Sequence, residues 1–305
     1  MTNSLRPAAF AFDAVAKEYD LRFGEWGSVN AQRRAVRSAL LREFPEHGYI
    51  LEMGGGTGED ATFLVKCGRR VLLTDASPAM VSIARSKLFP LGAMAEIVAA
   101  EDIAQFAARH LCAGGQRFDG AFSNFAPLNC VSSLDGVARG LSRLLKPGAP
   151  AMLVLFGTFC PGEILTELLR GRPDSALRRR QLDEVPARLA SRKFSVTYHR
   201  CAELRRSFAP WFVLEKRYGI GITVPPSAAE PWISRQAHLL AAMEALDKLL
   251  CRALACFGDH ILYQFRRTTE EPEVLSAITG GAHFATGISR GYLNDYTETL
   301  IRHQQ

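Results

Sequence analysis

Long apolar runs and a leader-like N-terminus are both missing from this sequence. A membrane-spanning helix needs about 18 or more consecutive apolar residues, and the best candidate, 149–162, is interrupted by two prolines and two glycines. The first twenty residues include Arg6 and Asp13 but no apolar stretch of the kind found in a signal peptide. We therefore expect a cytoplasmic protein without a membrane partner.

Cysteine is scarce and irregularly spaced. The seven cysteines are odd in number and contain no CxxC pair, which argues against a disulfide framework and against a zinc site. No bound metal is expected. The 25 glycines and 15 prolines are an average share, which excludes collagen-like and low-complexity chains.

The formal net charge of +6 comes mainly from one segment. Residues 161–206 hold eleven basic and six acidic side chains, and they include the run Arg178-Arg179-Arg180. A local basic field can attract an anionic small molecule or a nucleic acid. The alternative is a solvated helical face without a ligand, and the sequence leaves both interpretations open.

Short apolar segments alternate with helical patterns of about ten residues over the middle of the chain. Strands are expected at 49–53, 70–74, 95–100, 118–123 and 151–156, and helices at 59–67, 78–88, 103–111 and 134–145. This alternation predicts a doubly wound α/β fold with a mainly parallel sheet. Two later segments rich in aromatic and β-branched residues, 211–222 and 260–267, bring the expected sheet to seven strands.

The most informative segment joins the first strand to the helix that follows it. It reads Glu52-Met-Gly-Gly-Gly-Thr-Gly-Glu-Asp60, with glycines at four of five consecutive positions. Glycine allows a tight turn and lets a ligand approach the backbone without a Cβ clash. A plain strand-to-helix turn needs one glycine, so this loop is predicted to bind a ligand.

Two ligands compete for this loop. Gly56, Gly58 and Ala61 satisfy a loose dinucleotide pattern, but a pyrophosphate would lie on a helix N-terminus that carries Glu59 and Asp60. These two carboxylates, with the acid before the loop, favour a ligand that has a cationic end and no phosphate. S-adenosylmethionine has both properties, so the charges favour it over a dinucleotide and over an oxidoreductase.

Asp75 ends the second strand, 17 residues after Gly58. An acid at this position can accept hydrogen bonds from both hydroxyls of a ribose. The alternative role is a cap or turn residue before the helix that begins at Pro78. We interpret Asp75 as a ribose ligand because the glycine loop precedes it.

Over about residues 8–157 the chain resembles the class I S-adenosylmethionine-dependent methyltransferases, in particular those that act on small molecules. Residues 12–20 look like the N-terminal helix that many members fold over the cofactor, and Glu52-Met-Gly54-Gly-Gly56-Thr-Gly58 matches the acidic-then-glycine motif of the family. Further matching segments are 75–80, 100–103, 118–125 and 144–148. The implied fold is Rossmann-like, with a helical cap or insertion.

The resemblance implies a cofactor site for S-adenosylmethionine, with S-adenosylhomocysteine as the product. The residues expected to bind it are Tyr19, Glu52, Gly54, Gly56, Gly58, Asp75, Ala76, Met80, Asp102, Ile103, Ser123 and Asn124, and those expected to bind the substrate are Phe125 and Asn129. One segment departs from the family, since Val98-Ala99-Ala100 stands where many members have Gly-Asp-Ala. We therefore expect Asp102 to meet the adenine amino group and the Ile103 amide to meet a ring nitrogen.

The methyltransferase domain is expected to cover residues 1–267. Within it, residues 1–45 would form lid helices, 158–190 a basic helical insertion and 223–258 a cap segment. Residues 268–305 are a C-terminal extension to which the sequence assigns no role, with one candidate helix at 291–302.

The predicted reaction is methyl transfer to an oxygen or nitrogen of a small-molecule metabolite by in-line displacement. A lid and an inserted cap suit a small molecule, including an anionic one, better than an open nucleic-acid groove. The alternative is an RNA methyltransferase that uses the Arg178-Arg179-Arg180 run, although no RNA-binding motif is visible. None of the seven histidines stands out as a general base, and Arg33 or Arg34 is a candidate partner for the cofactor carboxylate.

Overall fold

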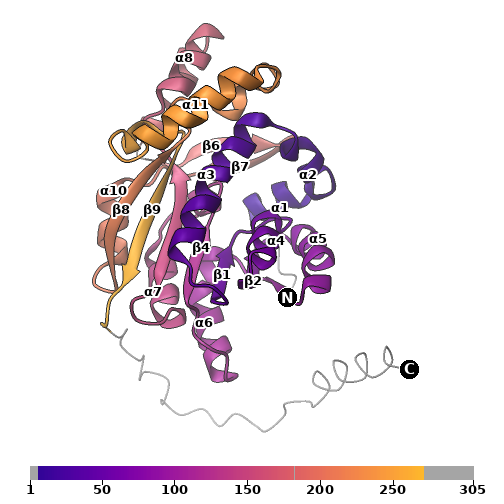
Figure 1. The fold of residues 1–305 in the computed structure, drawn as a ribbon, viewed down its shortest axis with the longest axis vertical. Helices are drawn as coiled ribbons and strands as arrows, with labels where there is room; N and C mark the ends of the chain where they lie inside the picture. The colour runs from indigo at the N-terminus through magenta and orange to yellow at the C-terminus, as the bar shows by residue number, and fades with distance from the viewer. Residues whose placement is uncertain (1–5, 182, 271–305) are drawn as a thin grey trace. The chain divides into compact units, whose positions relative to one another are not determined.

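The computed structural model describes residues 6–181 and 183–270. The candidate helix at 291–302 and nearly all of the extension 268–305 lie outside these residues. A seven-stranded sheet with the order β3-β2-β1-β4-β5-β9-β8 forms the centre (Figure 1). The strands are β1 (Tyr49–Met53), β2 (Arg70–Asp75), β3 (Met94–Ile97), β4 (Gly120–Ser123), β5 (Pro150–Phe156), β8 (Phe212–Ile220) and β9 (His260–Arg267).

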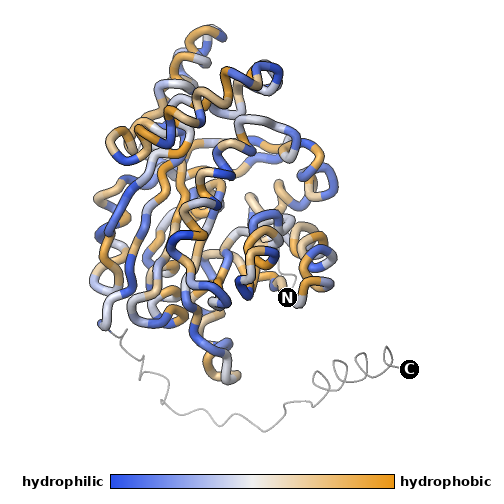
Figure 2. The backbone as a smooth tube through the Cα atoms, viewed as in Figure 1, coloured by the Kyte–Doolittle hydropathy of each residue, from blue (hydrophilic) through white to orange (hydrophobic). Residues whose placement is uncertain are grey.

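Five strands of this sheet, from β3 to β5, run parallel, whereas β9 pairs antiparallel with β5 and β8 pairs antiparallel with β9. The doubly wound, mainly parallel sheet predicted from the alternation is therefore confirmed. Figure 2 shows largely hydrophobic inner strands and a hydrophilic stretch on the outer strand β8. This contrast follows from burial, since inner parallel strands are covered on both faces.

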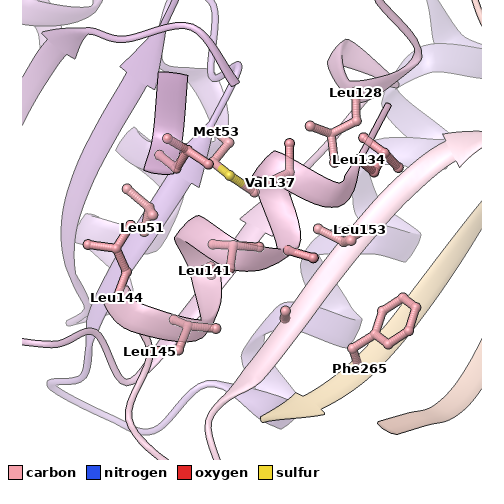
Figure 3. Close-up of a cluster of buried hydrophobic side chains, with 14 of the residues drawn as sticks. Leu51, Met53, Leu128, Leu134, Val137, Leu141, Leu144, Leu145, Leu153 and Phe265 are labelled. Atoms are coloured by element: carbon pink, nitrogen blue, oxygen red, sulfur yellow. The ribbon is translucent and has the colours of Figure 1, made fainter. Parts of the chain in front are cut away.

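Helices cover both faces of the sheet and form two cores. The first involves α3 (Gly27–Glu43), α4 (Glu59–Lys66) and α5 (Pro78–Leu88), and the second involves α6 (Ile103–Cys112), α7 (Asp135–Leu144) and α10 (Cys201–Phe208). Successive residues of β1 enter opposite cores, Ile50 the first and Leu51 the second, as the two-residue period of a strand requires. Figure 3 shows Leu51 and Met53 of β1 beside leucines of α7 in the second core.

The start of α5 follows the capping rules. The side chain of Ser77 accepts a hydrogen bond from the Met80 amide and Pro78 occupies the first turn of α5, as the sequence predicts. The predicted N-terminal helix is present but divided into α1 (Pro7–Asp13) and α2 (Ala16–Gly24). Among the described residues, no helix combines the length and the apolarity that crossing a membrane would require.

The insertion at 158–190 is helical only in its first part, which corrects the prediction. It contains α8 (Pro161–Leu169), α9 (Pro173–Ala176) and a 3-10 turn at 178–180. The chain then forms a hairpin of β6 (Val185–Leu189) and β7 (Arg192–Val196). The hairpin turn is Ala190-Ser191, with φ of 47° and 65°, the left-handed pair that a tight hairpin turn needs. The turn contains no glycine, so the usual sequence signal for it is missing.

The cap segment 223–258 is carried by α11 (Ala237–Leu250), which packs on α3. Asp247 of this helix accepts hydrogen bonds from the amides of Ile222 and Thr223, at 3.0 and 2.6 Å. The cap is therefore tied to the segment that leaves β8.

A buried ion-pair cluster fixes the helical insertion to the sheet. The guanidinium of Arg179 donates to the Asp259 carboxylate at 2.6 Å and to the Asp259 carbonyl at 2.7 Å, and it also pairs with Glu163. All three side chains are buried. Burial alone would raise the pKa of Asp259, but the adjacent His260 and Arg179 hold it below its ordinary value. The cluster thus joins α8, the 3-10 turn and the start of β9.

Replacing Arg179 with Met is expected to lower the free energy of unfolding by about 3–5 kcal/mol, because two buried carboxylates lose their shared cation. Urea unfolding at pH 7 measures this loss, and Arg180→Met at the exposed neighbour is the matched control. The pKa of Asp259 is depressed in the folded protein, so its contribution is complete above the unfolded pKa of about 3.9. It is lost as pH falls below that value, and the two variants should then converge. If both variants lost the same free energy of unfolding at pH 7, the buried ion-pair cluster would not stabilise the fold as proposed.

Candidate functional site

The site lies at the carboxyl ends of the parallel strands, where the strand order reverses between β1 and β4. Ligands of open α/β sheets bind at this point. A cavity of about 750 Å³ opens there, within the usual range for small-molecule sites. The loops after β1, β2 and β4 line it from below, and α1, α2 and the β6–β7 hairpin line it from above.

The glycine loop has the backbone that only glycine adopts readily. Gly54, Gly56 and Gly58 have φ of 65°, 54° and 83°. A Cβ on Gly54 would lie 2.4 Å from the Cβ of Pro127, so the loops after β1 and β4 touch there. A Cβ on Gly56 would meet no atom within 4 Å, and because Gly56 lines the cavity it would enter that space. Gly56 therefore leaves room for a ligand against the backbone.

Asp75 faces the cavity from the end of β2. One carboxylate oxygen accepts the Gly56 amide and the other accepts the Ser77 amide, each at 2.8 Å. Burial raises the pKa of Asp75, and these backbone hydrogen bonds oppose the rise. Ser77 is the N-cap of α5, so the capping role considered for Asp75 is filled by another residue, whereas the bond from the Ser77 amide is the turn contact that was also considered for Asp75. The carboxylate is held between two loops and keeps free lone pairs toward the cavity.

The acids at the start of α4 do not line the cavity, which corrects the charge argument made from the sequence. The Asp60 carboxylate accepts Arg37 Nε at 2.6 Å and Asn124 Nδ2 at 2.8 Å. Glu59 pairs with Lys87 at 2.7 Å. Cations from α3 and α5 neutralise these two charges. The sequence does not show that these distant residues pair with them. They therefore supply no open negative field that would exclude a phosphate.

Glu52 lies behind the glycine loop and is buried. Burial, with the nearby carboxylates of Asp60 and Asp75, raises the pKa of Glu52 well above its ordinary value. Its Oε2 atom has no hydrogen-bond partner within the described part of the chain. A buried acceptor without a donor is costly, so this carboxyl is suited to receive a donor from a ligand.

The two N-terminal helices are tied to the loops beneath them. Asp13, at the end of α1, accepts hydrogen bonds from the Ser77 hydroxyl and the Ala79 amide, both at 2.8 Å. Asp20 of α2 accepts from the Thr57 hydroxyl in the glycine loop and from Lys87 at 2.6 Å. These contacts hold α1 and α2 closed over the cavity.

At one end of the cavity, Val98, Ala100 and Glu101 form the wall. Asp102 and Ile103, which the resemblance places at the adenine, are not part of that wall. The carboxylate of Asp102 instead makes a bidentate pair with the Arg6 guanidinium, with both distances 2.8 Å. Arg6 itself lines the cavity, so the start of α1 closes this end through its ion pair.

Eight of the fourteen predicted site residues meet around the cavity. They are Tyr19, Gly54, Gly56, Asp75, Ala76, Met80, Asn124 and Phe125. The residues that lie outside its wall are Glu52, Gly58, Asp102, Ile103, Ser123 and Asn129.

Asn129, expected at the substrate, is fully buried and bonded to backbone. Its amide donates to the Thr197 carbonyl at 2.6 Å and its oxygen accepts the Phe156 amide at 3.0 Å. The side chain therefore joins the end of β5 to the segment after β7. This places it behind the wall that it was predicted to form.

The turn after β4 has an unusual backbone. Phe125 and Ala126 both have positive φ, 57° and 62°, although neither is glycine. Such residues cluster at functional sites because the surroundings must impose the conformation. The Asn124 side chain accepts the Phe125 amide at 2.8 Å, and the Arg33 guanidinium lies 5.1 Å from the Phe125 ring centre. These contacts hold the Phe125 ring at the cavity.

Sequence reasoning missed the far wall of the cavity. Phe156, Phe194 and Tyr198 line it together with Arg178 and Lys193. The available signal was the set of aromatic residues at the end of the fifth strand and around 194–198. Without the hairpin, nothing in the sequence indicated that this segment folds back over the sheet.

Among the described residues no histidine lines the cavity. His260 comes nearest, since its ring stacks on Phe156 at 4.8 Å and meets Phe125 edge-on at 5.8 Å. It is buried behind both rings, with Nδ1 3.4 Å from the Asp259 carboxylate. His238, on α11, is exposed and distant from the lining. The structure thus offers no imidazole in the wall of the site.

Comparison with known proteins agrees with this geometry. Residues 50–148, from β1 through the turn before β5, match the methyltransferase domain family. A comparison with curated protein sequences returns no match. Two solved structures show the same fold at low sequence identity. A Listeria monocytogenes protein described as an S-adenosylmethionine-dependent methyltransferase has a TM-score of 0.51 and 15% identity, covering 76% of this chain and 96% of its own. The DhpI complex with S-adenosylhomocysteine has a TM-score of 0.50 and 15% identity, covering 87% and 97%.

The fold, the glycine loop with Asp75, and the family match together define the class of protein. The chain carries a methyltransferase domain on a class I methyltransferase fold. Its methyl donor is S-adenosylmethionine, as the resemblance predicted.

Gly56→Ala is expected to weaken S-adenosylhomocysteine binding at least about tenfold, because the added methyl enters the cavity at the backbone that should contact the ligand. Titration calorimetry measures the affinity. Gly92→Ala is the matched control, since Gly92 also has positive φ and open space around its Cβ position but lies outside the cavity. Both variants should lose about 1–2 kcal/mol of stability from backbone strain. Unchanged binding by the folded Gly56→Ala protein would remove the loop from the site.

Proposed function

We propose that the protein transfers a methyl group from S-adenosylmethionine to an oxygen or nitrogen atom of a small-molecule metabolite. The observation that carries this proposal is the cavity of about 750 Å³, which α1, α2 and the β6–β7 hairpin line on the side away from the sheet. A polymer would need an open groove, whereas a roofed cavity suits a whole small molecule. A cytoplasmic, biosynthetic setting is part of the proposal, and the seven free thiols support it.

We assign the adenosine half of the cofactor to the wall formed by the loops after β1, β2 and β3. The Asp75 carboxylate, already oriented by two amides, would accept the ribose hydroxyls, while Ala76 and Met80 would lie beside the adenosine. Asp102 could accept a hydrogen bond from the adenine amino group only after its carboxylate has separated from the Arg6 guanidinium. Glu101, which lines the cavity, is the alternative acceptor.

Arg33 is the better of the two arginines considered for the cofactor carboxylate. It is buried, its Nε has no hydrogen-bond partner in the described chain, and Asp60 is 3.7 Å away. Asp60 is already bonded to Arg37 and Asn124, so Arg33 keeps donors for another anion. Arg34 is exposed and paired with Glu244.

Tyr19 and Glu52 are proposed to complete the methionine end. The Tyr19 ring lines the cavity beside Phe23, at 4.8 Å between centroids, and burial raises the pKa of its hydroxyl to about 12. The side chain is therefore uncharged at neutral pH, and its ring face can contact a sulfonium. Glu52 lies behind the cavity wall, so its unpartnered oxygen would be satisfied by a positively charged amino group only where that group reaches past the glycine loop.

The transfer itself needs alignment more than acid–base chemistry. The bound cofactor supplies a methyl carbon activated by sulfonium; the acceptor lone pair forms the new bond as the carbon–sulfur bond breaks. The protein holds the reacting atoms about 3–3.5 Å apart and in line. Phe125 and Asn124, at the end of β4, line this part of the cavity. We assign no general base, because the cavity wall in the described residues contains no histidine.

The alternative RNA methyltransferase loses its main support in the structure. Arg179 belongs to the buried ion-pair cluster with Asp259 and Glu163, and Arg178 donates to Glu163 at 2.9 Å. Of the three consecutive arginines, Arg180 alone has no ion pair with a described residue. A row of three free cations along a nucleic-acid backbone is therefore not available here.

Arg33→Gln is expected to weaken S-adenosylhomocysteine binding about ten- to a hundredfold, since a hydrogen bond to a charged group contributes about 1.5–3 kcal/mol. Methylthioadenosine lacks the amino acid portion, so the affinity of the variant for it should match that of the unmodified protein. Arg34→Gln, one residue along α3, should bind both ligands normally. A parallel loss for both ligands in Arg33→Gln would place the arginine outside the carboxylate site.

The proposed acceptor class is tested with S-adenosylmethionine labelled in its methyl group. The pure protein is incubated with this donor and an extract of its source cells, and label is measured in the small-molecule, RNA and protein fractions. We expect label in the small-molecule fraction, and at a limiting concentration of the donor we expect much less of it with Gly56→Ala. Label confined to RNA or protein would overturn the proposal.

A further inference from the structure

We propose that the acceptor half of the cavity binds a planar aromatic molecule that carries an anionic group, with Lys193 selecting the anion. This inference rests on the proposed function, because it takes the half of the cavity far from the glycine loop as the acceptor site. The strand order supports that division. Asp75 ends β2 and Phe156 ends β5, and β1 and β4 lie between them.

Aromatic rings from separate elements enclose this half. Phe125 follows β4, Phe156 ends β5, Phe194 lies on β7, Tyr198 follows it, and Phe12 reaches down from α1. The Phe156 and Tyr198 rings are 6.0 Å apart, and the Phe12 and Phe194 rings are 5.9 Å apart, both tilted. Rings in these arrangements present faces and edges that pair well with another flat ring. A strongly hydrated acceptor would use little of this apolar surface.

The roof above these rings is positively charged. The β6–β7 hairpin, residues 185–196, contains Arg188, Arg192 and Lys193 and no acidic residue. None of the three forms an ion pair with any residue that the structure describes. Arg192 lies over the Phe10 ring, whereas Lys193 lines the cavity. A cation that lacks a partner and borders an apolar cavity favours an anion there.

The other charges around this half do not cancel Lys193. Arg178 lines the cavity, but it shares Glu163 with Arg179, whose second carboxylate partner is Asp259, so that cluster is balanced within itself. Glu184, just before β6, is the one carboxylate on this part of the wall within the described residues. Glu184 and Lys193 are both exposed, so water weakens the fields of both, and the two arginines of the hairpin leave the balance of charge on this side positive.

The remaining polar groups on this wall are neutral near pH 7. Burial raises the pKa of Cys130 to about 12, and burial also raises the pKa of the Tyr198 hydroxyl. Neither group therefore adds a negative charge that would compete for Lys193. An acceptor with a carboxylate, sulfonate or phosphate beside its ring would place the ring among the aromatic side chains and the anion at Lys193.

A matched pair of fluorescent probes tests this assignment on the full-length protein saturated with S-adenosylhomocysteine. Anilinonaphthalene sulfonate is a flat aromatic anion, and phenylnaphthylamine is the same scaffold without the charge. The anion should bind at one site per chain and more tightly than its neutral analogue. Lys193→Gln should weaken the anion about tenfold or more, as expected for a hydrogen bond to a charged group, and leave the neutral probe unchanged. Lys193→Arg should restore binding of the anion.

Arg188→Gln is the matched control, because Arg188 pairs with Lys193 in the hairpin register but does not line the cavity. It should weaken the anion much less than Lys193→Gln does and leave the neutral probe unaffected, whereas Phe194→Ser should weaken both. Equal losses for Lys193→Gln and Arg188→Gln, or equal affinity for the two probes, would overturn the assignment. Failure to bind S-adenosylhomocysteine would instead count against the proposed function, so the two failures are distinguishable.

Discussion

The contact between the loop after β1 and the loop after β4 is the constraint on which the site depends. Pro127 occupies the space where a Cβ of residue 54 would lie, so this position accepts glycine alone. This close approach brings the glycine loop and the Phe125 turn to one cavity at the point where the strand order reverses. A larger residue at position 54 would separate the two loops, and the cavity would lose its shared floor.

Both loops need left-handed backbone, but they obtain it in different ways. Glycines supply it after β1 without a steric cost. After β4, Phe125 and Ala126 adopt it at a cost of about 1–2 kcal/mol each. The Asn124 side chain and the bond from the Ala126 amide to the Val154 carbonyl, at 3.2 Å, help to impose it. The strain is located in the turn whose side chains are proposed to face the reacting atoms, as expected for a functional turn.

Sequence patterns predicted the sheet well because each of its signals is local. The alternation of apolar strands with helices, the Ser77-Pro78 helix start and the glycine loop all follow from residues adjacent in the chain. The hairpin at 185–196 was missed because Ala190 and Ser191 adopt positive φ without glycine or asparagine. The turn is held by its surroundings, and those come from elsewhere in the sequence.

The charge argument for the cofactor failed for a related reason. Glu59 and Asp60 are next to the glycine loop in sequence, but Lys87 and Arg37 reach them from other helices. Formal charges along a chain therefore predict a field only where no partner folds against them. Lys193 differs from Glu59 and Asp60 in this respect, because the described structure supplies no acidic partner for it. Its charge can therefore act on a ligand.

The roof of the cavity has two parts with different attachments. Over the cofactor half, Asp13 and Asp20 bind the cap of α5 and the glycine loop, which are the elements proposed to contact the cofactor. Over the acceptor half, the hairpin contacts α1 through apolar rings such as Phe12 and Phe194, and the Thr197 amide bonds to the Asn129 carbonyl at 2.7 Å. Opening the cofactor half breaks several charge-assisted hydrogen bonds, whereas displacing the hairpin from α1 mainly separates rings. Because α1 belongs to both parts, a bound cofactor that holds α1 in place also sets one wall of the acceptor site.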